Sequence, residues 1–565
     1  MLLKDYKVKI PEGVRIQKKD NSYYVYVKDK YIYKKDKGYS IEKRICIGKK
    51  IDDEYMIPND KYSFYYDDLE LNLLEPREFS DTLKIGNIIL FNKISKDLEL
   101  EDILNVHKEK KDTLFNLISY LLIKESSVFQ YYPDFAYDHN IRGRIYSDSF
   151  LSKYLQSFSD QEIRLFLDSW NSLYRNESKI YINYDSTNMN SDAKGIELLE
   201  YGHSKKEVDL RQVNLSFASL AKDATPLFYE VYPGSIIDNQ ELGSMANQAI
   251  DYGYKDIGFI LDRGYYSKKN IDYLDEKHYS FILMIKDNNS FVQSIKQDMK
   301  TMISSNDIDC FISEYSIYGK TYKSKLFESD KKNRYVHVYY DELSAASEKN
   351  TILSNVSKME TLLQSMIESD NIKDAHKKKC ERFSKYFNLH YQDEYLVSFS
   401  KKKSEIRKQL DNCGYFALIS SEKYEAADII SIYRSRDSIE KLFMIMKSHM
   451  DLDALRVYYD SSLRAKLHIG FIASIIRNDL FNKLKTLKTE YNDRKHYTVP
   501  AAIKELEKIE CTRNFNNNLY EKRYILTARQ KKILKLYDID DKYIEIEVKK
   551  INESMKQMFP ELYQK

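Results

Sequence analysis

An alternating series of strand and helix patterns between residues 179 and 285 constrains the fold of this 565-residue chain more than any other feature. Runs rich in β-branched and aromatic residues mark strand candidates at 179–184, 213–220, 227–232, 257–261 and 279–285. Asp238 and Ser267 are N-cap candidates for two helices that separate the last three of these strands. The order β-β-β-α-β-α-β predicts a mixed sheet covered by helices, which is an α/β fold.

Changes of pattern divide the whole chain into six expected segments. We expect an N-terminal basic β-rich region (1–110), a helical region (111–178), the first part of the sheet core (179–285), a β-rich insertion subdomain (286–413), the second part of the core (414–480) and a C-terminal helical region (481–565).

Local signals support several of these segments. In the first, strand candidates at 23–27, 31–33 and 41–47 are separated by the turn-like sequences KDK and KKDKG. Ser159 and Glu162 form a capping box for a helix. The insertion is predicted to hold strands and one helix, at 309–316, 335–340, 395–399 and 344–370. A single strong helix is predicted at 426–447.

The net charge of +3 hides an uneven distribution along the chain. Residues 1–50 contain 15 Lys/Arg and 6 Asp/Glu, whereas residues 51–110 contain 7 and 15. Residues 373–408 contain 11 Lys/Arg and 5 Asp/Glu. Basic stretches beside acidic ones fit a nucleic-acid-binding protein with local docking surfaces. They equally fit the solvated faces of a lysine-rich protein, and charge alone leaves both open.

Other features exclude whole classes of protein. No apolar stretch approaches the roughly 20 residues of a membrane span, so we expect no membrane partner. The first ten residues carry charges where a signal peptide would be apolar, so the expected location is cytoplasmic. Five scattered cysteines without a CxxC pair support neither a disulfide framework nor a zinc ribbon.

Three acidic residues form a candidate metal site. Asp185 and Asp262 each follow a strand candidate, and their carboxylates can share a Mg²⁺ ion if the two strands are neighbours. The expected helix at 426–447 supplies Glu440, which shares one side, within about 60° of arc, with Tyr433, Arg436 and Lys447. An apolar stripe runs beside them. Asp428 and Asp437 are rival third acids.

The spacing Tyr433-x2-Arg436-x3-Glu440-x6-Lys447 resembles the signature of insertion-sequence transposases of the family-four type, a DDE class with an RNase H-like core. Four further segments are similar to motifs of that family: YDSTN around Asp185, YGHSKKEVDLRQV at 201–213, YEVYPGSIID at 229–238 and LDRGYYS at 261–267. The resemblance covers roughly residues 180–480, with an insertion where such enzymes carry one.

The resemblance implies a DNA transposase that binds terminal inverted repeats and catalyses metal-dependent cleavage and strand transfer. It implies that Asp185, Asp262 and Glu440 are catalytic and hold two Mg²⁺ ions, for which Mn²⁺ can substitute. The implied partners are double-stranded DNA, as element ends and target, and a second copy of the chain in a homodimer. DNA contacts are implied for four more side chains: Tyr433, Arg436, Lys447 and Arg263. No role is assigned to His203, Lys205 or Arg211.

Simpler interpretations of these residues stay open from the sequence. Asp185 fits a turn cap, Asp262 a surface ion pair with Arg263, and Glu440 an i,i+4 pair with Arg436. At the level of the whole protein, the alternatives are a catalytically silent, domesticated DNA-binding protein with the same fold and an RNase H-like nuclease for another substrate. An aromatic side chain of the insertion could also stack an unpaired base.

Overall fold

The computed structural model describes residues 7–34, 39–59, 61–62, 65–66, 80–143, 145–177, 179–202, 210–236, 242–285, 290–304, 307–327, 329–330, 333–369, 376–490, 497–514 and 517–558. Asp238, His203 and Lys205 lie outside these residues. The chain separates into two compact units. The first comprises Met1–Ser80, Asn514–Leu519 and Lys550–Lys565, and the second comprises Asp81–Arg513 and Tyr520–Lys549.

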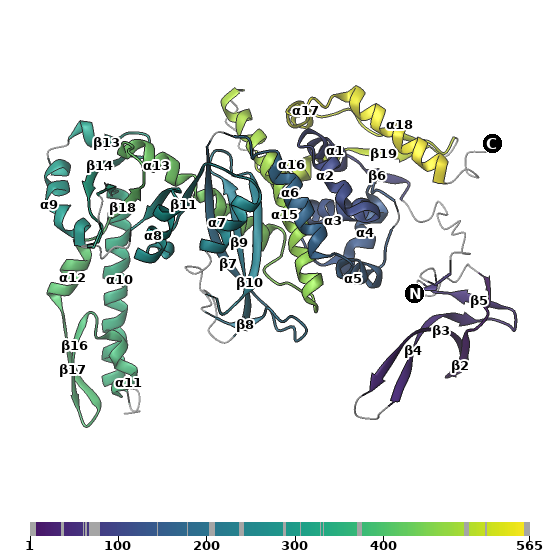
Figure 1. Cartoon of the computed structure of the whole chain (residues 1–565), viewed down its shortest axis with the longest axis horizontal. Coiled ribbons are helices and arrows are strands. Elements are labelled where there is room, and N and C mark those ends of the chain that lie inside the picture. Colours follow the sequence, from purple (N-terminus) through teal and green to yellow (C-terminus); the bar gives the residue numbers. More distant parts are fainter. Residues whose placement is uncertain are drawn as a thin grey trace. The chain divides into compact units, whose positions relative to one another are not determined.

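An antiparallel sheet forms most of the first unit (Figure 1). Its strands, in the order β1-β5-β4-β3-β2, are β1 (Val8–Lys9), β2 (Arg15–Lys19), β3 (Ser22–Lys34), β4 (Tyr39–Lys50) and β5 (Tyr55–Pro58). The two strands expected at 23–27 and 31–33 are one strand, β3, because the sequence KDK forms a bulge instead of a turn. Lys28 and Lys30 pair with the adjacent β4 residues Arg44 and Lys43, which leaves Asp29 as the extra residue.

The second unit begins with a short strand and a group of helices. They are β6 (Thr82–Lys84), α1 (Gly86–Asp97), α2 (Leu100–Ile103), η3 (Leu104–Lys110), α3 (Lys111–Lys124), η4 (Phe129–Tyr131), α4 (Tyr132–Asp138), α5 (Asp148–Gln156) and α6 (Asp160–Ser172). The chain is therefore helical from Gly86, inside the range expected to be β-rich, because α1 buries Leu90 and Ile94 at helical spacing. The capping box of Ser159 and Glu162 is present at α6.

A large mixed sheet follows, and five of its first six strands, all except the short β8, occur in the predicted order. The elements are β7 (Ile180–Asn190), β8 (Glu200–Tyr201), β9 (Arg211–Leu220), β10 (Pro226–Pro233), α7 (Leu242–Asp251), β11 (Ile257–Leu261), η6 (Arg263–Tyr265), α8 (Lys268–Glu276) and β12 (Ser280–Met284). Neighbours run β10-β9-β7-β11-β12; the first two pairs are antiparallel and the last two parallel. This is an RNase H-like arrangement. Ser267 caps α8 as expected.

The region expected as an inserted subdomain contributes to this same sheet. Its elements are α9 (Ser290–Ser304), η7 (Ile308–Cys310), β13 (Phe311–Ile312), β14 (Ile317–Ser324), β15 (Arg334–Tyr340), α10 (Glu342–Ile367), α11 (Lys377–Cys380), η9 (Glu381–Phe383), β16 (Phe387–Gln392), β17 (Tyr395–Lys401) and α12 (Lys403–Leu410). Strands β15, β14 and β13 continue the sheet beyond β18 (Tyr415–Ser420). The strand expected at 309–316 is instead a 3-10 turn, the short β13 and a second turn.

The outer part of that region has a hydrophobic core of its own. The β16–β17 hairpin lies along α10 (Figure 1). Phe387 and Leu396 of the hairpin form a buried hydrophobic cluster with Leu363 of α10. The outer part, α10 to α12, therefore packs on itself, whereas β13, β14 and β15 belong to the main sheet.

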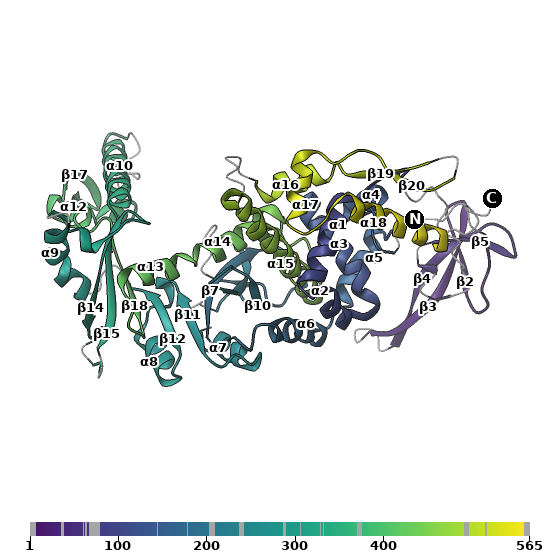
Figure 2. The same cartoon turned by 90° about the horizontal axis from the view of Figure 1, so that it is seen from above.

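The chain after β18 is mostly helical but not as regular as expected. Its elements are α13 (Ala426–Arg434), α14 (Asp437–Met444), the π-helix η10 (Ile445–His449), α15 (Asp460–Glu490), α16 (Val499–Leu506), β19 (Glu510–Arg513), β20 (Tyr520–Lys522), α17 (Ala528–Lys535) and α18 (Asp541–Met558). The single helix predicted at 426–447 is thus wrong. Figure 2 shows α13 and α14 in succession along the sheet, where α13 packs on β14 and β15 and α14 packs on β7 and β9.

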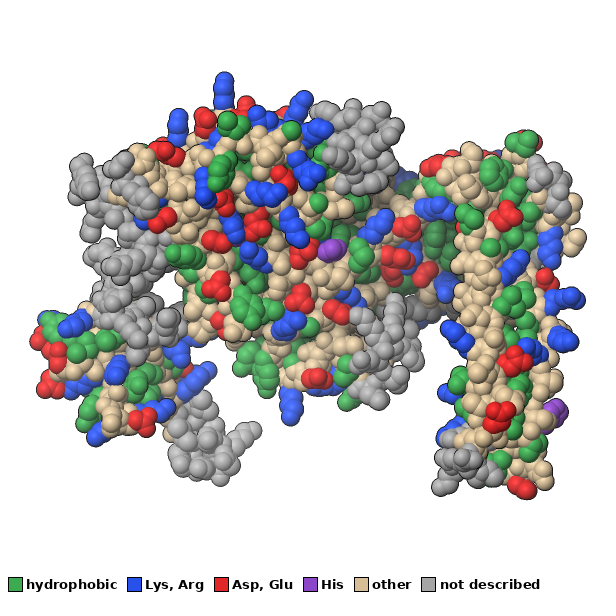
Figure 3. Space-filling view, turned by 180° about the vertical axis from the view of Figure 1, so that it is seen from behind, with side chains coloured by type: hydrophobic (Ala, Val, Ile, Leu, Met, Phe, Trp, Pro, Cys, Tyr) green, Lys and Arg blue, Asp and Glu red, His purple; other side chains and the backbone are tan. Residues whose placement is uncertain are grey.

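Two general properties of the described residues bear on function. None of the helices among them is both long and apolar enough to cross a membrane. Figure 3 shows Lys and Arg side chains interspersed with Asp and Glu on the face seen there, so the charge is not gathered into one large patch on that face.

Candidate active site

The strand register places the two aspartates next to each other. Strands β7 and β11 are parallel, with Ile260 beside Asn183, and the same offset carried two residues further sets Asp262 beside Asp185. Asp262 follows the last residue of β11, as the sequence predicts. Asp185, by contrast, lies within β7, because the strand continues to Asn190 in pairing with β9.

Backbone hydrogen bonds orient both carboxylates in the same way. Oδ1 of Asp185 accepts a hydrogen bond from the N–H of Ser186 at 2.9 Å. Oδ1 of Asp262 accepts one from the N–H of Arg263 at 2.7 Å, which caps η6. In each aspartate the second oxygen, Oδ2, is the one that faces the helical side of the site.

A single guanidinium contacts all three predicted acids. Nη2 of Arg436 donates to Oδ2 of Asp185 at 2.7 Å and lies 3.5 Å from Oδ2 of Asp262. Nη1 of Arg436 donates to Oε1 of Glu440 at 2.7 Å. Acids that are 77 and 178 residues apart in sequence therefore converge on one side chain, and the i,i+4 pair of Arg436 with Glu440 exists as well.

The joint between α13 and α14 positions Arg436, and an asparagine of β7 holds that joint. Nδ2 of Asn183 donates to the carbonyl oxygen of Ser435 at 3.2 Å, and Oγ of Ser435 donates to Oδ1 of Asn183 at 3.2 Å. Asn183 is fully buried and lies two residues before Asp185, so both side chains point to the same face of the sheet. The sequence reasoning did not select Asn183, although a polar residue inside an apolar strand was the available signal.

Burial differs sharply among the members of the cluster. The side chains of Arg436 and Asp185 are 10% and 15% exposed, whereas those of Asp262 and Glu440 are 35% and 59% exposed. Burial lowers the pKa of the Arg436 guanidinium, but the surrounding acids, Asp185 first, outweigh it and raise that pKa above its usual value. The guanidinium is therefore a permanent cation held by anions.

The four residues expected to contact DNA occupy different environments. Tyr433 is buried in an apolar cluster with Ile260 and Leu418, and this burial raises the pKa of its hydroxyl. Lys447 lies in the π-helix, donates to the backbone carbonyl of Asn188 in β7 and is 3.8 Å from Asp453.

Arg263 is exposed at the start of η6, and Arg436 contacts the acids. The even row predicted from a straight helix is wrong, because the chain changes direction at Ser435–Arg436 and forms a π-helix from Ile445.

The donor set suits a hard divalent cation. Asp185, Asp262 and Glu440 offer carboxylate oxygens, the ligands that Mg²⁺ prefers, and they exceed the charge of Arg436 by two. In the arrangement described, Arg436 stands among these oxygens, and no three acidic, His or Cys side chains of the described ranges are grouped closely enough to hold a metal. The donor chemistry therefore fits a metal, and both the arginine and the acidic side chains have to rearrange before three carboxylates meet at one ion.

The chain was compared with family models, curated proteins and solved structures. A family model described as "Transposase DDE domain" matches residues 183–476, slightly more than half of the chain. The comparison with curated proteins found no match. Among solved structures, the chain is similar to the piggyBac transposase synaptic complex with hairpin DNA, at 8% identity and a TM-score of 0.33, covering 82% of each chain.

Proposed function

Because this chain belongs to the transposase DDE domain family, we propose that it is an insertion-sequence transposase of the family-four type. In this proposal it binds the terminal inverted repeats of a mobile element and catalyses Mg²⁺-dependent DNA cleavage and strand transfer. The observation that carries the proposal is the convergence of Asp185, Asp262 and Glu440 on one guanidinium, in a helix with the family's signature spacing.

The proposed chemistry assigns the three carboxylates to metal binding. A bound metal pair supplies activation of the attacking water or 3′-hydroxyl and neutralisation of the departing oxygen. The protein's own part is to hold Asp185 and Asp262 on adjacent strands and Glu440 on the helix above them. No side-chain nucleophile is needed for this reaction. Mn²⁺ is the expected substitute for Mg²⁺.

The proposed DNA contacts come from cations and a hydroxyl around the acids. Arg436 and Lys447 contact phosphates near the cleaved end, Tyr433 donates a hydrogen bond to a phosphate oxygen, and Arg263 holds the scissile strand. The N-terminal basic region is a further DNA-contacting part. We further propose that the protein acts in the cytoplasm as a homodimer, because two element ends must be held together.

The test replaces Glu440 and compares it with its neighbour on the same helix. Glu440→Gln removes a metal ligand, so cleavage of a labelled duplex that carries the element end should be abolished while binding of that duplex persists. Asp437→Asn is the matched control, since Asp437 is an exposed acid of α14 and the rival third acid. If Glu440→Gln cuts at the wild-type rate in Mg²⁺, the assignment is wrong.

The same assay separates the alternative functions. A silent DNA-binding protein would bind the end duplex tightly and never nick it, even in Mn²⁺. A nuclease for another substrate would cut duplexes with and without the inverted repeat at equal rates. Cleavage restricted to the inverted repeat supports transposition.

A further inference from the structure

The cluster around Arg436 contains more negative than positive charge. Three carboxylates contact a single guanidinium, which leaves an excess of two negative charges among groups within 3.5 Å of it. The next basic side chain of the signature, Lys447, is engaged with the carbonyl of Asn188 and with Asp453 instead. Arg436 is thus a cation that contacts all three acids.

The contacts of Arg436 use the oxygens that a metal would need. Oδ2 of Asp185, Oδ2 of Asp262 and Oε1 of Glu440 each face the guanidinium, while Oδ1 of both aspartates accepts backbone N–H groups. Two cationic centres a few ångströms apart repel each other. Metal and guanidinium therefore compete for the same position.

The guanidinium is also incompletely satisfied where it is. The side chain is nine-tenths buried, and its Nε has no hydrogen-bond partner within the described parts of the chain. An unpaired buried donor costs free energy. A phosphate group offers a guanidinium two parallel hydrogen bonds, including one to Nε.

Hydrogen bonds hold the backbone beside Arg436, so that the exchange of partners is a movement of side chains, those of the acids included. Asn183 and Ser435 lock the preceding residue to β7 through two hydrogen bonds. The N–H of Arg436 donates to the carbonyl of Tyr433, and its own carbonyl accepts from Ile439. A rotation of the side chain about this anchored backbone takes the guanidinium away from its partners, and the exposed Glu440 side chain has room to turn toward the aspartates.

We propose that Arg436 couples DNA binding to metal binding by exchanging three carboxylates for a DNA phosphate. Without DNA the guanidinium occupies the place of the metal and weakens metal binding. A phosphate of bound DNA draws the guanidinium away and frees the carboxylates. The coupling is reciprocal, since metal binding releases Arg436 for the phosphate and strengthens DNA binding by the same factor. This inference rests on the proposed transposase function.

The test measures Mn²⁺ affinity by electron paramagnetic resonance on the full chain, with and without a duplex carrying the element end. Without DNA, Arg436→Gln should bind Mn²⁺ about tenfold more tightly than the wild type. With DNA, the wild type should gain about tenfold and Arg436→Gln should change little. Arg436→Lys, which keeps the charge but loses the forked geometry, should lie between them.

A neighbouring arginine provides the control. Arg434 lies two residues away on α13, over the ring of Tyr315, so Arg434→Gln should leave the Mn²⁺ affinity as in the wild type. Melting curves establish that each variant is folded. The wild-type measurement with and without DNA needs no variant and tests the coupling by itself.

Two outcomes would overturn the inference in distinguishable ways. Equal Mn²⁺ affinity in the wild type and Arg436→Gln, unaffected by DNA, would show that Arg436 does not compete with metal, while end cleavage could still support the transposase. No Mn²⁺ binding in any protein, with or without DNA, would overturn both the coupling and the metal site.

Discussion

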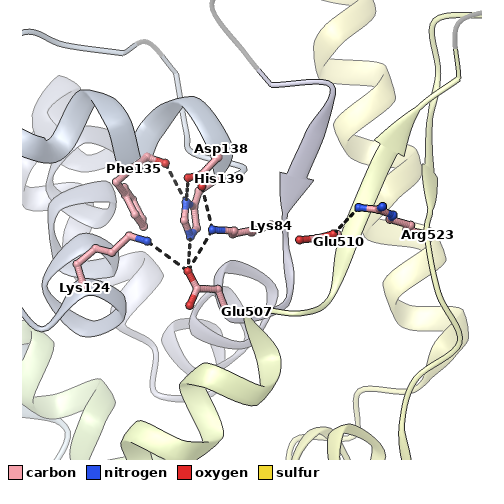
Figure 4. Close-up of polar contacts among 8 residues, drawn as sticks. All are labelled: Lys84, Lys124, Phe135, Asp138, His139, Glu507, Glu510 and Arg523. Carbon is pink, nitrogen blue, oxygen red and sulfur yellow. Dashed lines mark hydrogen bonds and ion pairs between the residues drawn. The ribbon is translucent and has the colours of Figure 1, made fainter.

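Two charged clusters of this protein connect distant parts of the chain, but they differ in charge balance. In the cluster of Figure 4, Glu507 accepts hydrogen bonds from Lys84 at 3.3 Å and Lys124 at 3.2 Å, and Lys84 also donates to Asp138 at 2.9 Å. Two lysines thus face two acids. In the cluster of Arg436, one cation faces three acids.

The balanced cluster has the properties of a structural link. It joins β6, α3 and α4 to the end of α16, and His139 completes it with a bond from Nδ1 to Asp138. Burial raises the pKa of Asp138, but His139 and Lys84 overcome it and hold that pKa at about 2. Each charge here is already neutralised, whereas the excess of two negative charges at Arg436 is what a divalent cation can neutralise. The charge balance of the two clusters therefore distinguishes a structural link from a candidate metal-binding site.

The largest effect should come from removing an acid of the unbalanced cluster. Asp185→Asn takes away a metal ligand and the main partner of Arg436, so cleavage of end DNA should fall by about 10³-fold or more. The rate constant for cleavage of a labelled duplex measures this. Glu507→Gln serves as the matched change in the balanced cluster and should leave the cleavage rate per folded molecule unchanged. A comparable loss in both variants would refute the distinction.

Mild acid should destabilise the protein by protonating a buried pair of histidines, His107 and His468, and not through either charged cluster. Nε2 of His107 and Nε2 of His468 lie 3.2 Å apart, and burial lowers the pKa of His107 to about 4 and that of His468 further. Between pH 6.5 and about 4 the unfolded chain binds protons that the folded chain does not, so stability falls as the pH falls. We expect His107 alone to account for a loss of about 3 kcal/mol in the free energy of unfolding, and His468 for at least as much again.

Urea unfolding at several pH values between 7 and 4 measures this loss. The cluster of Figure 4 should persist over that range, because the pKa of Asp138 is about 2. His468→Leu should flatten the pH dependence. An equally steep dependence in that variant would assign the effect to other groups, such as the buried His337, whose pKa burial also lowers to about 4.

Breaking the balanced cluster should cost stability alone. Glu507→Gln keeps the shape of the side chain but removes the anion that Lys124 contacts and leaves Lys84 with Asp138 alone, and Glu507 is only 26% exposed. The free energy of unfolding should fall by about 1–2 kcal/mol, measured in urea at pH 7. An unchanged free energy of unfolding would mean that the cluster does not stabilise the protein and that packing alone joins these elements.

The smallest effect should come from an exposed ion pair. Lys222 and Glu177 lie 2.5 Å apart with side chains 55% and 34% exposed, so water and salt screen their attraction. Lys222→Met should change the free energy of unfolding by less than about 0.5 kcal/mol. A larger loss of unfolding free energy in Lys222→Met than in Glu507→Gln would show that burial does not decide how much an ion pair stabilises the protein.

Local signals in the sequence predicted much of the fold. The strand at 257–261, the strand at 335–340 and the caps Ser159 and Ser267 all occur where expected, because each depends on residues only a few positions apart. The prediction failed where tertiary contacts override local pattern. Pairing with β9 extends β7 past Asp185, and pairing with β18 brings β15 into the main sheet.

For the candidate site, two strand endings and one spaced motif in the sequence indicated which acids to consider. The folded chain adds that Asp262 lies beside Asp185, that Asn183 holds the joint at Ser435, and that Arg436 stands among all three acids. The reason is that a residue's type and spacing set what its side chain can bind, whereas strand register and helix packing set which oxygen atoms it meets.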